Sequence, residues 1–84
     1  MADAQLLPGT RVAGTVAAHR PWGLEALLDD GVSVTVDLRF IDDEVTVWGD
    51  PHRWPALGSR MSGLVQGIMP NGQIRVTLRL SDQS

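Results

Sequence analysis

The sequence lacks several features that would direct it toward other classes of protein. Its 84 residues include no cysteine, so neither a disulfide nor a thiolate metal site can stabilise the fold. The N-terminal stretch MADAQLL has no basic segment followed by an apolar one, so we expect no signal peptide there. No apolar run approaches the roughly 20 residues that a membrane helix needs. We therefore expect a cytoplasmic protein that has no membrane partner.

The shortness of the chain limits the core that it can build. A single domain of this size buries only about 60–65% of the surface that its unfolded chain exposes. Without disulfides or thiolate metal sites, the core must be economical, and a closed or nearly closed β-barrel provides such a core.

The charged residues are unevenly distributed along the chain. The formal net charge is −3, and all seven cationic residues are arginines. Residues 1–50 carry nine acidic residues against three arginines, a balance of −6, whereas residues 51–84 carry one against four, a balance of +3. If the fold places the two halves on different faces, the basic face could meet an anionic partner.

Alternation of apolar and polar residues predicts five short strands separated by turn signals. The predicted strands cover residues 11–18, 24–28, 32–38, 60–69 and 73–80. Pro21-Trp22-Gly23 forms a corner between the first two, because Pro21 cannot donate to a ladder and Gly23 can bend sharply. Gly14, within the first strand, indicates a close backbone approach or a strong bend. In the fifth strand we expect Ile74, Val76, Leu78 and Leu80 to face inward, and Gln73, Arg75, Thr77 and Arg79 to face outward.

The connection between the third and fourth strands has a more complex pattern. Residues 45–48 are compatible with a short edge strand, and Asp50-Pro51 is typical of a helix N-cap followed by proline. We expect Trp48 and Trp54 to close one end of the barrel. The whole pattern predicts an all-β, five-stranded Greek-key barrel of the OB type, with a short helical turn between strands 3 and 4. A small SH3-like barrel is the alternative fold.

Four stretches stand in a distinctive order and spacing: GTRVAGTV at 9–16, PWGL at 21–24, LGSRM at 57–61 and NGQIRVTL at 71–78. Together they resemble a single S1 domain, the RNA-binding branch of the OB fold. The resemblance covers residues 8–80, which we expect to form the domain, between a flexible arm (residues 1–7) and a C-terminal tail (residues 81–84).

Two positions depart from the S1 pattern. S1 domains typically carry a second aromatic residue shortly after the corner glycine, where this chain has Glu25. They often carry a histidine near the end of the third strand, where this chain has Asp37. Both replacements place negative charge where an RNA base or phosphate would be expected.

The resemblance and the residue types together predict a weak binding site for single-stranded RNA. Trp22 would stack on a base. Arg11, Arg60, Arg75 and Arg79 would contact phosphates, which position a strand without reading its sequence. Alternatively, Trp22 anchors the corner against the barrel wall, and the arginines form a solvated face that keeps the sheet soluble.

A second hypothesis assigns the chain to protein interaction. In this case an OB-fold module that has lost RNA binding would dock its acidic surface on a basic protein partner. An exposed barrel edge could also pair with another copy, which leaves a monomer or a weak homo-oligomer possible.

The sequence carries no pattern typical of catalysis or of a bound cofactor. Asp42, Asp43 and Glu44 alternate in direction in an extended chain and supply no ligand geometry, so a solvated acidic loop is expected rather than a metal site. His19 and His52 have neither metal-ligand spacing nor an adjacent nucleophile motif. We expect a protein that is not an enzyme and that binds no metal or cofactor.

Overall fold

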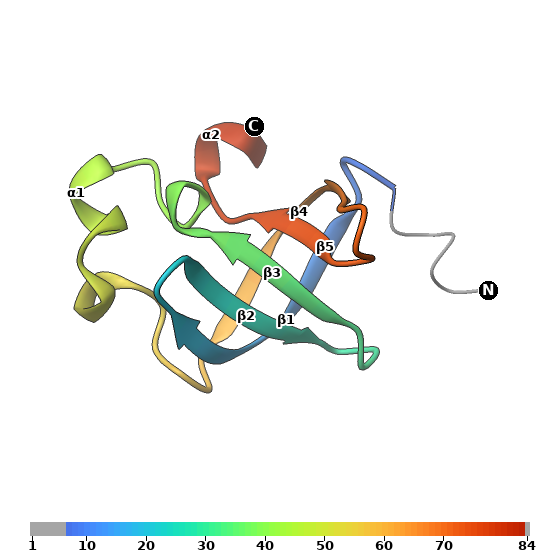
Figure 1. Cartoon of the computed structure of the whole chain (residues 1–84), viewed down its shortest axis with the longest axis horizontal. Coiled ribbons are helices and arrows are strands. Elements are labelled where there is room, and N and C mark those ends of the chain that lie inside the picture. The colour runs from blue at the N-terminus through green and yellow to red at the C-terminus, as the bar shows by residue number, and fades with distance from the viewer. Residues whose placement is uncertain (1–6, 84) are drawn as a thin grey trace.

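The computed structural model describes residues 7–83 as a small closed β-barrel with short helical segments at its ends (Figure 1). Its elements, in chain order, are β1 (Arg11–Arg20), β2 (Gly23–Leu28), β3 (Ser33–Asp37), η2 (Leu38–Phe40), α1 (Val45–Trp48), η3 (Pro51–Arg53), β4 (Arg60–Ile68), β5 (Ile74–Thr77) and α2 (Leu80–Gln83). Of the predicted N-terminal arm, residues 1–6 lie outside the described residues.

The strands close in the order β1-β2-β3-β5-β4, and every pair is antiparallel except β3 with β5. The parallel pair is short: the register joins Val34 to Ile74 and Thr35 to Arg75. These two residue pairs are called the β3–β5 seam below. Beyond both strands, Leu78 N donates to the carbonyl of Phe40 at 2.8 Å. The predicted five-stranded Greek-key barrel of the OB type is confirmed.

Two glycines allow the first two strands to bend around the barrel. Gly23 begins β2 with φ of +148°, and a Cβ there would overlap the carbonyl oxygen of Val36. At Gly14, a Cβ would lie 2.7 Å from Leu28 Cα, a separation that real Cβ atoms do not show. The close approach predicted at Gly14 is therefore present, and it lets β1 cross β2 without a side chain between them.

The core is a single cluster of buried apolar side chains from the barrel and the β3–β4 connection. It consists of Val12, Val16, Leu24, Ala26, Leu28, Val34, Val36, Ile41, Val47, Trp54, Met61, Val65, Ile74 and Val76. Trp54 is only 6% exposed, and its indole Nε1 donates to the carbonyl of Val47 at 2.8 Å. The His19 ring packs against the same indole in a T-shaped arrangement, with centroids 5.4 Å apart. Trp54 therefore closes its end of the barrel as predicted, whereas Trp48 stays half-buried outside the cluster.

The edge strand considered for residues 45–48 is wrong, because these residues form α1. A closed barrel offers no free strand edge against which this segment could pair. One helical turn instead buries Val47 and leaves Val45 64% exposed. The helix N-cap predicted at Asp50 is present: its carboxylate accepts a hydrogen bond from His52 N, and η3 begins at Pro51.

The fifth strand is shorter than predicted, and two of its predicted directions are wrong. β5 ends at Thr77, and Leu80 is 74% exposed rather than inward-facing. Thr77, predicted to face outward, is only 3% exposed because α2 folds over it. Its hydroxyl donates to Asp82 at 2.6 Å and accepts from Arg79 N. Residues 81–83 thus form a helical turn with Leu80.

Candidate nucleic-acid interface

The corner between β1 and β2 presents one large aromatic side chain to solvent. Pro21 and Trp22 form the turn, and the carbonyl of Trp22 accepts a hydrogen bond from Leu38 N at 2.9 Å. The backbone of the corner is thereby tied to the end of β3, while the Trp22 side chain remains outside the core. Trp22 is 41% exposed, in contrast to Trp54. Its ring is therefore available to a ligand.

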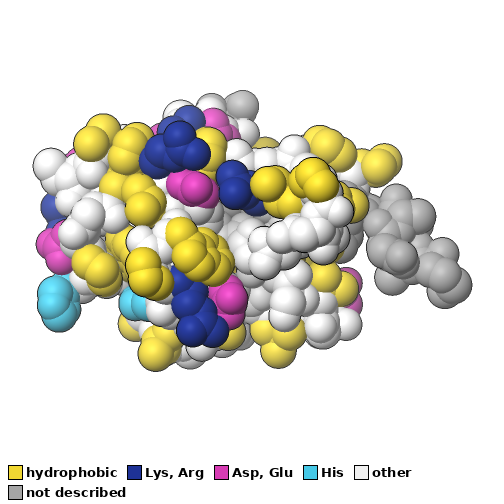
Figure 2. All heavy atoms as spheres, in the orientation of Figure 1, with side chains coloured by type: hydrophobic (Ala, Val, Ile, Leu, Met, Phe, Trp, Pro, Cys, Tyr) yellow, Lys and Arg dark blue, Asp and Glu magenta, His cyan; other side chains and the backbone are white. Residues whose placement is uncertain are grey.

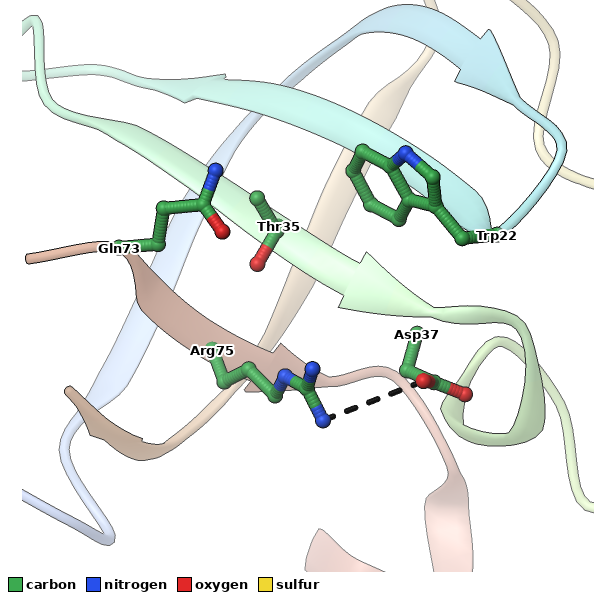
Figure 3. A pocket seen from close by; sticks show the side chains of 5 residues that line it. All are labelled: Trp22, Thr35, Asp37, Gln73 and Arg75. Atoms are coloured by element: carbon green, nitrogen blue, oxygen red, sulfur yellow. Dashed lines mark ion pairs between the residues drawn. The ribbon is translucent and has the colours of Figure 1, made fainter. Parts of the chain in front are cut away.

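Trp22 forms one wall of a solvent-open hollow of about 260 Å³ over β3 and β5 (Figure 3). The other lining side chains are Thr35 and Asp37 from β3, Arg75 from β5, and Gln73 just before β5. The parallel register sets Thr35 beside Arg75, and the Thr35 hydroxyl lies 3.4 Å from the carbonyl of Ile74, to which it donates. The hollow therefore combines one aromatic face with an amide, a guanidinium and a carboxylate. It lies directly over the β3–β5 seam.

Asp37 is the charged centre of this hollow. Its Oδ1 accepts hydrogen bonds from Arg39 N at 2.9 Å and Arg39 Nε at 3.1 Å, and its Oδ2 lies 3.9 Å from Arg75 Nη1. Partial burial opposes its ionised form, but the Arg39 hydrogen bonds and the charges of Arg39 and Arg75 outweigh this effect. The pKa of Asp37 therefore lies below its ordinary value. The carboxylate is ionised at neutral pH and is only 19% exposed.

Of the four arginines predicted to contact phosphate, only Arg75 lines this hollow. Arg60 forms a two-point ion pair with Asp29 at 2.6 and 2.8 Å, at the β2–β3 turn. Arg11 donates to Gln83 Oε1 at 3.0 Å. Arg79 packs on the Phe40 ring, 5.0 Å from its centroid, and its guanidinium is held by Asp82. The four arginines therefore lie in separate contacts and do not line one site together.

The sequence did not predict the polar floor of the hollow. Gln73 was predicted only to face outward, Asp37 only as a departure from the S1 pattern, and Thr35 was not singled out. The signal that unites them is the parallel pairing of β3 with β5, which alternation along single strands does not reveal. Glu25 pairs with Thr35 across β2 and β3, and its carboxylate accepts from Arg20 at 3.2 Å. It therefore lies beside the hollow as part of an ion pair.

The acidic and basic halves of the sequence do not form separate faces. Three arginines of residues 51–84 pair with carboxylates of residues 1–50: Arg53 with Glu44, Arg60 with Asp29, and Arg75 with Asp37. Figure 2 likewise shows basic and acidic side chains beside one another on the face that carries the hollow. The charge polarity considered from the sequence is therefore absent from this face, and local contacts decide its electrostatics.

The acidic residues that follow η2, in the connection between β3 and β4, form hydrogen bonds that hold this loop. The carboxylate of Asp42 accepts a hydrogen bond from Glu44 N at 2.9 Å, which is typical of a turn built on an aspartate. Asp43 accepts from the Ser81 side chain, which ties this loop to α2.

Within residues 7–83, no group of three or more metal-ligating side chains is assembled. Over the same residues, no helix is long and apolar enough to cross a membrane.

The barrel order, the short parallel pair and the helical connection before β4 define an S1-like OB-fold domain. Solved structures share this fold. GSP13 from Bacillus subtilis matches with a TM-score of 0.76 and 16% identity, over 93% of this chain and 59% of that one. A chain of the a/eIF2alpha-aDim2p-rRNA complex from Pyrococcus horikoshii matches with a TM-score of 0.76 and 20% identity, over 92% of this chain and 48% of that one. The alpha subunit of aIF2 from Pyrococcus abyssi matches with a TM-score of 0.72 and 19% identity, over 87% of this chain and 28% of that one.

These matches concern the fold alone, because every identity is 20% or lower. The chain spans about a quarter to three fifths of the length of the chains that it matches. No protein-family model matches the sequence, and no curated protein does so either.

Proposed function

We propose that this chain is a non-catalytic S1-like module that binds single-stranded RNA weakly, with one base stacked on Trp22. The observation that carries the proposal is the exposed Trp22 ring over a polar hollow on β3 and β5. OB folds bind oligonucleotides on the face formed by strands 2 and 3. One of the structures with this fold is a complex that contains rRNA, according to its name. That complex supports the proposal by analogy of fold.

The dimensions of the hollow favour part of a strand rather than a whole small ligand. Its volume of about 260 Å³ is below the roughly 300–1,000 Å³ of pockets that enclose drug-sized molecules. The hollow is open to solvent, so a polymer bound there could extend beyond it. Stacking on an aromatic side chain contributes about 1–3 kcal/mol per base and tolerates every base. A single stacked base with few phosphate contacts gives weak binding.

Arg75 is the phosphate contact that we assign to this site, because it alone of the four predicted arginines lines the hollow. Arg11, Arg60 and Arg79 would have to leave Gln83, Asp29 and Asp82, respectively, before they could bind a phosphate in the same strand. With one or two phosphate contacts, log K should fall with log salt at a slope of about −0.7 to −1.4.

The alternative, an acidic surface that docks on a basic protein, has less support. It requires a face of one charge, whereas Arg53, Arg60 and Arg75 neutralise acidic residues of the first half. A solvent-exposed tryptophan beside a polar hollow is also explained more directly by base stacking than by docking of basic side chains.

Fluorescence anisotropy of a labelled mixed-sequence RNA at low and moderate salt tests the proposal. Trp22→Ala should weaken binding by roughly 5- to 150-fold, which corresponds to the loss of one stacked base, whereas Trp22→Phe should retain most of the affinity. Arg75→Gln should weaken binding and flatten the salt dependence. Arg53→Gln is the matched control, since it removes the same charge from the β3–β4 connection, away from the hollow.

Two results would contradict the proposal. One is an absence of RNA binding at low salt. The other is RNA binding that Trp22→Ala leaves unchanged, because the site would then lie elsewhere on the surface.

A further inference from the structure

The acceptor capacity of Asp37 is only partly used within the protein. An ionised carboxylate accepts hydrogen bonds at about four lone-pair positions and donates none. Both hydrogen bonds from Arg39 go to Oδ1. Oδ2 lies 3.9 Å from Arg75 Nη1, which is beyond hydrogen-bond distance. Figure 3 shows this oxygen turned toward Arg75 at the side of the hollow.

The RNA bases differ in what they offer to such an oxygen. Adenine, cytosine and guanine each carry an exocyclic amino group, and carboxylate side chains accept hydrogen bonds from the amino group of cytosine. Uracil has no amino group, and its single ring N–H lies between two carbonyl oxygens. An N–H that reaches an ionised carboxylate forms a charge-assisted hydrogen bond. A carbonyl placed against the same carboxylate is repelled.

The rest of the hollow does not reverse this preference. The Thr35 hydroxyl already donates to the carbonyl of Ile74 and therefore presents only acceptor positions to a base. The Gln73 amide can donate or accept, and Trp22 stacks on any base. Arg75 can donate to a carbonyl, but cytosine and guanine also carry one. Asp37 is thus the group that distinguishes bases with an amino group from uracil.

We propose that the hollow selects bases that carry an exocyclic amino group over uracil, with Asp37 Oδ2 as the acceptor. This inference rests on the proposed binding of RNA at Trp22. It adds a base class to a contact that stacking alone would leave unselective. A single charge-assisted hydrogen bond is worth less than a full bidentate base contact, so we expect roughly a five- to tenfold preference.

The test compares labelled oligo(C) and oligo(U) of equal length, which share the pyrimidine ring and differ at position 4 and in the N3 proton. The wild-type chain should bind oligo(C) roughly five- to tenfold more tightly than oligo(U). Asp37→Asn, which offers both a donor and an acceptor, should reduce the ratio to within about twofold. Asp29→Asn removes a paired carboxylate outside the hollow and should leave the ratio unchanged.

A second measurement does not depend on how well the variants fold. Oligo(C) in which the amino group is dimethylated has no N–H at that position, and the wild-type chain should bind it about as weakly as oligo(U). Oligo(C) with a single methyl group keeps one N–H and should bind more tightly than the dimethylated form.

The outcomes separate this inference from the proposed function. Equal affinity for oligo(C) and oligo(U), or a preference for oligo(U), would overturn the selectivity while RNA binding stands. A preference for oligo(C) that survives both Asp37→Asn and dimethylation would overturn the role of Asp37. If neither oligomer binds at low salt, the proposed function itself fails, and the base preference with it.

Discussion

Two glycines of β4 provide a quantitative test of how the barrel closes. A Cβ built on Gly63 would lie 2.2 Å from the carbonyl oxygen of Thr77 and 2.9 Å from Val76 Cγ1, on the neighbouring β5. Ordinary van der Waals contacts of a Cβ begin at 3.4 Å, so Gly63→Ala would require β5 to move by more than 1 Å. Gly67 lies on the same strand, and a Cβ there has no atom within 4 Å.

Overpacking costs typically 1–3 kcal/mol, and occasionally more where neighbouring atoms cannot rotate away. Because Thr77 O belongs to the backbone, we expect Gly63→Ala to lower the free energy of unfolding by about 3 kcal/mol or more. For a domain of this size, this corresponds to a Tm lower by roughly 12–24 °C. Gly67→Ala should be neutral or raise the stability by about 0.5–1 kcal/mol, because alanine loses less conformational entropy than glycine in a strand.

Urea unfolding followed by tryptophan fluorescence, together with thermal melts, measures both variants under one set of conditions. Similar free energies of unfolding for Gly63→Ala and Gly67→Ala would refute the reasoning, since the two changes differ only in the space around the new methyl group. A marked loss of stability in Gly67→Ala alone would also refute it.

Two further predictions concern the ion pairs and the buried indole. Hydrogen bonds from neighbouring side chains hold the pKa values of four carboxyl groups below their ordinary values, those of Asp29, Asp43, Glu44 and Asp82. The folded state then binds fewer protons than the unfolded state, so the stability that these groups contribute is present above about pH 4 and is lost as the pH falls through their folded values. Urea midpoints should therefore fall between about pH 5 and pH 2.5, and a constant midpoint would contradict this. Trp54→Phe should destabilise the fold by about 1–3 kcal/mol, because the smaller ring leaves a cavity in the core and removes a buried hydrogen bond to the carbonyl of Val47, which retains the one from Asp50 N. Trp48→Phe, which removes an exposed hydrogen bond to Asp42, should cost less than about 1 kcal/mol in the same urea assay.

The residues that set local backbone geometry could be interpreted from the sequence. Gly14 and Gly23 predicted the close approach and the corner, and Asp50-Pro51 predicted a helical start, because each effect depends on a residue and its immediate neighbours. The five strands follow from alternation for the same reason, since burial on one face repeats every second residue.

The predictions that failed concern contacts that the closed barrel makes between residues far apart in the sequence. Thr77 is buried because α2 folds back over it, and residues 45–48 form a helix because no strand edge is free. The four arginines were predicted to contact phosphates, but each contacts another side chain of this chain, up to 72 positions away in the sequence for Arg11 and Gln83. Of the five residues that line the hollow, only Trp22 and Arg75 were predicted as site residues. The others are brought together by a parallel pairing between strands that lie far apart in the sequence.

The β3–β5 seam gives the hollow a second significance, in the cooperativity of the fold. The sheet closes there through two residue pairs, Val34 with Ile74 and Thr35 with Arg75, whereas the other strand pairs are longer. A ligand held between Trp22 and Arg75 would bridge the corner of β1 and β2 to β5, and so it would span the shortest pairing of the barrel. By linkage, a ligand at 100 times its Kd stabilises the folded state by about 2.7 kcal/mol. At this position the stabilisation would oppose opening of the barrel along its seam, so ligand occupancy and barrel closure would rise together.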